Sequence, residues 1–129
     1  MRTALFASFV FTTVFLAAQN NNYMVDPTWK VPSKVAQSSN PVKGSVEAVH
    51  RGSELYAAQC SMCHGSDGRG LTNAANFHLA AVQAESDGAL FWKITNGNPN
   101  KGMPAFKALN DKDRWSLVTY LRTFKANKK

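Results

Sequence analysis

The residues best suited to chemistry in this chain of 129 residues are two cysteines followed directly by a histidine, in the order Cys60-Ser61-Met62-Cys63-His64. Two cysteines three positions apart lie about one helical turn from each other, so both thiols face the same side. The next residue adds an imidazole beside them. This pattern favours covalent attachment of one haem, in which each thiol adds to one vinyl group and His64 becomes an iron ligand.

Three other kinds of site use closely spaced cysteines, and each remains an alternative. A thioredoxin-like redox site lies at a junction between a strand and a helix, whereas this motif follows a helical pattern. A zinc site needs further ligands, for which the sequence offers only His50 and His78. A plain disulfide between Cys60 and Cys63 is compatible with an oxidising compartment. Haem attachment is the hypothesis that also agrees with residues farther along the chain.

Met103, between Gly102 and Pro104, is the candidate for a second iron ligand. A soft thioether on a loop whose backbone is restrained on both sides suits the sixth position on iron. The alternative is that Met103 only packs in the core, which explains its place between glycine and proline less well. His78 and His50 are rival ligands, and His50 is expected on the solvent side of its helix.

Helices, rather than strands, are expected to position these groups, because no stretch alternates apolar and polar residues over the length of a strand. The first begins at the N-cap Ser45 and continues directly into Cys60, and the last begins at Asn110. Between them we expect a short helix near 76–84 and a longer one over 86–96. The sequence therefore predicts an all-α domain of three or four short helices with long connections.

The apolar faces of the first and last helices follow from their spacing. The expected stripe of the first helix consists of Val46, Val49, Gly52, Leu55 and Tyr56. The expected buried face of the last consists of Leu117, Val118, Leu121 and Phe124, with Trp115 and Tyr120 beside it.

The residues before this domain are expected to have a separate role. Arg2 is followed by a short uncharged apolar stretch that ends in small residues, which is typical of a secretory signal peptide over residues 1–18. A retained membrane anchor is the alternative, although the stretch is short for a bilayer span of about 20 residues. Residues 19–44 are polar and interrupted by prolines, which predicts an extended linker or a wrap over the domain, and the domain itself covers 45–129.

Composition limits the classes of function. The length suits one domain and excludes a large barrel or doubly wound architecture, and 15 basic against 8 acidic residues give a net charge of +7. This excess favours an acidic partner. Nucleic acid is not expected as that partner, because the sequence has no runs in which aromatic and basic residues alternate and the chain is predicted to be exported.

Five segments in order resemble a class I mono-haem cytochrome c. They begin at Gly52, Cys60, Asp87, Gly102 and Asp113, and the resemblance covers the chain from about Ser45 to its end. The resemblance implies that the first and last helices cross beside the haem.

The same resemblance assigns roles to residues around that crossing. Gly52 would permit close approach of the two helices, and Tyr56 would pack on Leu117 and Tyr120. Many relatives have a proline after the haem motif whose carbonyl accepts a hydrogen bond from the proximal histidine. Here that stretch contains no proline, so the carbonyl of Ala74 or Ala75 is expected to take its place.

A haem c held by Cys60 and Cys63, with His64 and Met103 on its iron, predicts a one-electron carrier rather than an enzyme, since no coordination site is left for substrate. An apolar shell would raise the reduction potential, because a low dielectric disfavours the extra charge of ferric iron. Its expected members are Phe77, Leu79, Leu90, Phe91, Phe106 and Leu117. The alternative is a haem-based peroxidase or gas-binding protein with a labile sixth ligand.

The expected partners of such a carrier are redox proteins of the periplasm or another exported compartment. A respiratory complex, a dehydrogenase and a terminal oxidase are all compatible with the sequence, and a membrane is expected as a partner only if the N-terminal segment is uncleaved. Lys101, Lys107 and Lys112 flank the Met103 loop and the last helix, and we expect them to attract an acidic docking surface.

Overall fold

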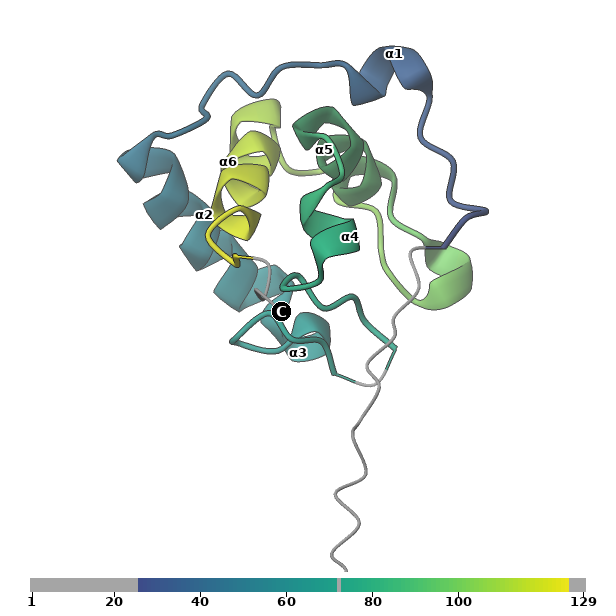
Figure 1. Cartoon of the computed structure of the whole chain (residues 1–129). Coiled ribbons are helices and arrows are strands. Elements are labelled where there is room, and N and C mark those ends of the chain that lie inside the picture. The colour runs from purple at the N-terminus through teal and green to yellow at the C-terminus, as the bar shows by residue number, and fades with distance from the viewer. Residues whose placement is uncertain (1–25, 72, 126–129) are drawn as a thin grey trace, which may run out of the picture.

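The computed structural model describes residues 26–71 and 73–125, and within those ranges it contains helices and no strand, as the sequence predicts (Figure 1). The α-helices are α1 (Ser33–Ala36), α2 (Val46–Gln59), α3 (Ser61–His64), α4 (Ala80–Gln83), α5 (Asp87–Asn96) and α6 (Asp111–Leu121), and η1 (Pro99–Lys101) is a 3₁₀ turn. Three of them, α2, α5 and α6, are longer than one turn, and they form the body of the domain.

Each of the three long helices begins at the N-cap that the sequence indicates. The side chains of Ser45, Ser86 and Asn110 accept hydrogen bonds from backbone amides three residues later, at 3.2, 3.1 and 2.9 Å. Such caps satisfy amides that have no partner inside the helix and contribute about 1 kcal/mol each. They explain why these helix starts are predicted from sequence to within a residue.

The contact between α2 and α6 centres on Gly52. A β-carbon at this position would lie 2.2 Å from the carbonyl oxygen of Ser116, so only glycine lets the two backbones approach this closely. One turn farther on, the ring of Tyr56 lies against that of Tyr120, with centroids 5.3 Å apart. Figure 1 shows the two helices side by side. The role expected of Gly52 is therefore confirmed, as is the expected contact of Tyr56 with Tyr120.

The apolar stripe of α2 differs from its prediction in its first turn, where Ala48 is buried in place of Val46 and Val49 is only half-buried. The buried residues are Ala48, Gly52, Leu55 and Tyr56, whereas the side chain of Val46 is 84% exposed. Val46 precedes Ala48 by two residues, or about 200° around the helix, so it faces away from the core.

The predicted face of α6 is buried in full. Leu117, Val118, Leu121 and Phe124 are each at most 9% exposed, and Trp115 is buried with them. They form one core with Leu55 and Tyr56 of α2, Leu90 and Ile94 of α5, and Phe77 and Val82 of the intervening segment.

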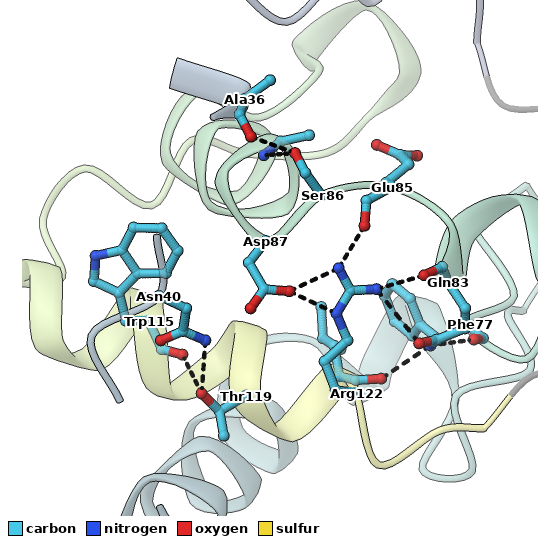
Figure 2. Close-up of polar contacts among 12 residues, drawn as sticks. Ala36, Asn40, Phe77, Gln83, Glu85, Ser86, Asp87, Trp115, Thr119 and Arg122 are labelled. Carbon is cyan, nitrogen blue, oxygen red and sulfur yellow. Dashed lines mark hydrogen bonds and ion pairs between the residues drawn. The ribbon is translucent and has the colours of Figure 1, made fainter. Parts of the chain in front are cut away.

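A polar network around Arg122 holds the segment between Phe77 and Asp87 against the end of α6 (Figure 2). The Arg122 guanidinium donates to the Gln83 carbonyl and to the Asp87 carboxylate, both at 2.8 Å. The Gln83 side-chain amide in turn donates to the Phe77 carbonyl at 2.7 Å. These bonds fix a stretch whose only regular element is the single turn α4.

Residues 26–44 lie against the domain, and α1 is a single helical turn within them. The Ser86 hydroxyl donates to the Ala36 carbonyl at 2.6 Å, and the Asn40 amide donates to the Thr119 hydroxyl at 3.0 Å (Figure 2). The predicted signal segment 1–18 lies outside the described residues. None of the helices in the described ranges combines the length and the apolar character that a bilayer crossing requires.

Candidate functional site

The cysteine–histidine motif occupies the end of α2 and the whole of α3. Cys60 is the C-cap residue directly after α2, and the following turn α3 carries Cys63 and His64. The thiol of Cys60 is half-buried and that of Cys63 is exposed, and the two are not joined in a disulfide. Burial raises the pKa of Cys60 to about 11, so this thiol is protonated at neutral pH.

His64 is held by a backbone carbonyl. Its Nδ1 lies 3.0 Å from the carbonyl oxygen of Ala75, and its ring stacks on Phe77 with centroids 4.7 Å apart. Burial lowers the pKa of His64, against a smaller opposing effect of the Ala75 hydrogen bond, so the ring is neutral at pH 7. A carbonyl can only accept, so we assign the proton to Nδ1, which leaves the Nε2 lone pair available to a metal.

The loop after the motif brings the Ala75 carbonyl to this place without the proline of many relatives. The amide of Gly70 donates to the carbonyl of His64, and that of Phe77 to the carbonyl of Gly68, both at 2.8 Å. The buried hydroxyl of Tyr56 donates to the Gly65 carbonyl at 2.7 Å. The sequence leaves two candidates for the carbonyl that accepts from His64, those of Ala74 and Ala75. In the structure the acceptor is the Ala75 carbonyl.

Met103 is held by a short antiparallel bridge. Asn98 and Met103 exchange two backbone hydrogen bonds of 2.9 and 3.1 Å across the turn η1. The amide of Phe106 then donates to the Ile94 carbonyl of α5 at 3.1 Å. The bridge keeps the thioether of Met103, which is half-buried, close to the end of α5.

His64 and Met103 line the same cavity. Its empty volume is about 520 Å³, the open mouth included, and its apolar wall consists of Ala75, Phe77, Val82, Leu90, Ile94 and Leu121. Cys60 and Cys63 lie outside this wall, on the turn that ends with His64. The fold thus brings one imidazole and one thioether, 39 positions apart in sequence, to a single apolar space.

The expected apolar shell matches this wall at two positions. Phe77 and Leu90 line the cavity, whereas Leu117 is fully buried in the core beyond it. Leu79, Phe91 and Phe106 pack against the outside of that core. Sequence reasoning missed Val82, Ile94 and Leu121, although Ile94 and Leu121 belong to helical stripes that the spacing does indicate.

Four further residues line the cavity that sequence reasoning did not select: Asp26, Trp29, Glu85 and Lys93. Lys93 is a charged residue on the apolar side of α5, and its Nζ lies 2.6 Å from the Glu85 carboxylate. The sequence indicates this ion pair only through the position of Lys93, a lysine within a helical stripe of apolar residues.

The rival histidines lie elsewhere. His50 is exposed and faces Glu54 on the outside of α2, at 3.7 Å. The two ring nitrogens of His78 lie 2.8 and 3.1 Å from the backbone carbonyls of Asp67 and Lys125. Neither histidine lines the cavity. No group of three or more His, Cys, Asp and Glu side chains gathers in the described ranges, whereas structural zinc takes about four ligands.

Comparison with protein families shows which family contains this chain. Residues 47–121 match the family described as "Cytochrome C oxidase, cbb3-type, subunit III", a cytochrome c domain family. The chain belongs to this family. It is a small c-type cytochrome with covalently bound haem c, and the family supports a role in electron transfer.

Individual relatives agree with this assignment. The cytochrome is 38% identical over 79 residues to cytochrome c-553 of Desulfomicrobium norvegicum, a match that covers 57% of this chain and 95% of that protein. It is 34% identical to the solved KustC0563 c-type cytochrome, with a TM-score of 0.53 over 57% of this chain and 96% of that one. Residues 26–44 precede the part of the cytochrome that the family model matches.

The site residues of the cytochrome fit haem c. Two unpaired thiols lie on consecutive turns directly before a neutral histidine, whose Nδ1 is occupied and whose Nε2 is available. A mostly apolar cavity with a thioether in its wall adjoins that histidine. Thiols, imidazole and thioether are the donors that c-type haem uses.

Proposed function

We propose that this cytochrome is a one-electron carrier in which Cys60 and Cys63 hold haem c and His64 and Met103 are its two axial ligands. The observation that carries the proposal is that His64 and Met103 line one apolar cavity. Haem c bound there supplies reversible one-electron chemistry at iron. With both axial positions taken by side chains, no place is left for oxygen, peroxide or substrate.

The side chains around the cavity would set the redox properties. The Ala75 carbonyl fixes the orientation of the His64 ring and makes it a better donor. The Met103 thioether favours the ferrous state relative to a second imidazole. Apolar walls add to this preference, because a low dielectric disfavours the additional positive charge of the ferric state.

A peroxidase or gas-binding role would require Met103 to be labile. The two backbone hydrogen bonds between Met103 and Asn98 and the tie of Phe106 to α5 both support a fixed thioether. The arrangement therefore favours the carrier over the ligand-binding haem protein.

The carrier is proposed to act in the periplasm or another exported compartment, with residues 1–18 as its signal peptide. Arg2 and the apolar stretch after it support this, as does the chemistry of a motif whose two thiols must be joined to haem. Its electron donor and acceptor would be redox proteins such as a dehydrogenase, a respiratory complex or a terminal oxidase.

Purification of the exported cytochrome with mass spectrometry and a redox titration tests this function. We expect the mass of the polypeptide to increase by that of one haem, and its N-terminus to follow residue 18. The redox titration should give a one-electron Nernst curve, with low-spin spectra in both oxidation states. Added peroxide or carbon monoxide should leave those spectra unchanged. A high-spin spectrum or rapid binding of carbon monoxide would instead indicate an open iron site and contradict the carrier.

Electrostatic steering of an acidic partner is expected to involve Lys101 and Lys107, which are exposed on the two sides of the Met103 loop. Lys112 differs from them, because it lies beside an acidic side chain. Its Nζ is 3.4 Å from the Glu47 carboxylate, at the start of α2, about 20 Å along that helix from Cys60.

Electron-transfer rates with an acidic redox partner should fall as salt rises, because the Debye length shrinks from about 10 Å at 0.1 M to about 3 Å at 1 M. Lys101→Gln and Lys107→Gln should each reduce both the rate at low salt and its salt dependence, whereas Lys112→Gln serves as the control and should change neither. Stopped-flow measurement over a salt series tests this. A rate independent of salt would leave these lysines without a role in docking.

A further inference from the structure

Two residues of the segment before the family domain, Asp26 and Trp29, line the cavity that holds His64 and Met103. We name residues 26–44 the N-terminal strap. In Figure 1 it rises from beside η1 to α1 and then passes over α5 and α6 to reach α2. The family match begins only at residue 47, so the strap lies outside the part of the chain that the family model matches.

The strap is anchored on α5 and α6 by backbone contacts. A β-carbon on Gly88 would lie 2.2 Å from the carbonyl oxygen of Val35, so α1 packs directly on the backbone of α5. The hydrogen bonds from Ser86 to Ala36 and from Asn40 to Thr119 secure it on both sides (Figure 2). The strap is therefore held in place independently of its first residues.

Those first residues reach the Met103 loop. Asp26 lines the cavity, and its carboxylate accepts hydrogen bonds from the Thr28 amide and hydroxyl at 2.9 and 2.6 Å. The same carboxylate accepts from the Asn98 side-chain amide at 3.3 Å. Asn98 is the residue whose backbone pairs with Met103. One hydrogen bond thus connects the strap to the backbone bridge that carries the proposed sixth ligand.

Trp29 covers a buried ion pair in the wall of the same cavity. The Lys93 ammonium lies 4.9 Å from the centre of the Trp29 ring and 2.6 Å from the Glu85 carboxylate. The side chains of Lys93 and Glu85 are only 10% and 17% exposed. A buried charge is costly unless it is paired and kept from competing water, so the indole stabilises this pair by covering it.

We propose that the N-terminal strap completes the haem cavity, with Asp26 and Trp29 as positioning residues that hold the Met103 loop closed and exclude water and small ligands from it. This inference rests on the proposed function, because it acts on the bond between Met103 and iron. A closed loop would keep the thioether of Met103 in place to bind iron, and a dry wall would raise the reduction potential.

The test is the rate at which imidazole displaces the sixth ligand of the ferric holoprotein, together with the reduction potential. Trp29→Ala should uncover the Lys93–Glu85 pair and admit water to the cavity, so it should bind imidazole faster, by on the order of tenfold, and have a lower potential. Trp29→Phe should restore most of the wild-type behaviour, because it keeps an aromatic cover over Lys93. Trp92→Ala is the matched control, since Trp92 lies on α5 outside the cavity wall.

A second variant keeps the test independent of folding. Asp26→Ala removes the tie to Asn98 and leaves the anchors at Val35, Ala36 and Asn40 in place, so it should also accelerate imidazole binding. Wild-type rates and potentials in both Asp26→Ala and Trp29→Ala would overturn the strap's role. Failure of the proposed function is a different result: Met103→Leu would then bind imidazole no faster than the wild-type protein.

Discussion

Met103→Ala is expected to convert the low-spin spectrum of this cytochrome into a high-spin one that binds carbon monoxide and cyanide. If the thioether occupies the sixth position, alanine leaves that position vacant or open to water. Some peroxidase activity should follow, because peroxide then reaches the iron. Covalent haem should be retained in full, since its attachment depends on Cys60 and Cys63 and not on the Met103 loop. Optical spectra of the purified variant in both oxidation states are the measurement.

Met103→His is expected to behave differently from alanine. Six-coordination and the low-spin spectrum should be kept, while the reduction potential falls, because imidazole stabilises ferric iron better than thioether does. A decrease on the order of 0.1 V is reasonable, given that axial ligands span about 0.8 V among haem proteins. A redox titration against the wild-type protein measures it.

Met62→Ala is the control for both substitutions. Met62 is 86% exposed within the attachment motif and does not line the cavity, so its loss should leave spectrum and potential unchanged. If Met103→Ala instead preserves the low-spin spectrum and the potential, the sixth ligand lies elsewhere. His78 is then the first candidate, although it would have to leave the carbonyls of Asp67 and Lys125.

The second large effect is expected on the covalent attachment of haem. Cys60→Ala and Cys63→Ala should each weaken or abolish covalent retention of haem, and the double variant should lose it completely. The fold should be destabilised as well, because a ligand that binds only the native state adds its binding free energy to stability. Haem staining of a denaturing gel, after expression in a host with haem-attachment machinery, reports retention, and thermal unfolding reports stability.

Ser61→Ala is the matched control for the cysteine variants. Ser61 lies between the two cysteines, and its hydroxyl donates to the Ala57 carbonyl of α2, at 2.8 Å. Its substitution should leave staining unchanged. Unstained wild-type protein from the same host would contradict haem attachment at this motif.

Local chemistry explains which parts of the fold were predictable. Ser45, Ser86 and Asn110 cap their helices with their own side chains, so each start can be read from a few neighbouring residues. The α6 face is buried as its spacing indicates, and Gly52 lies at the helix contact that the family resemblance implies.

The rest depends on contacts between distant segments. The Ala75 carbonyl reaches His64 through loop hydrogen bonds that no helical or strand period encodes. The pairing of Lys93 with Glu85 and the cover by Trp29 bring three separate elements together, so composition and spacing do not reveal them. Val46 is predicted to be buried but is exposed, since an apolar residue at the start of a helix need not face the core.

Proton NMR of the reduced protein with labelled methionine methyl groups tests most directly whether the Met103 sulfur binds iron. A methyl group held against the haem face experiences its ring current, which shifts the signal far upfield of ordinary methionine. We expect one such signal, retained in Met62→Leu and absent in Met103→Leu. A reduced protein without an upfield methionine methyl, or one whose upfield signal survives Met103→Leu, would contradict the account.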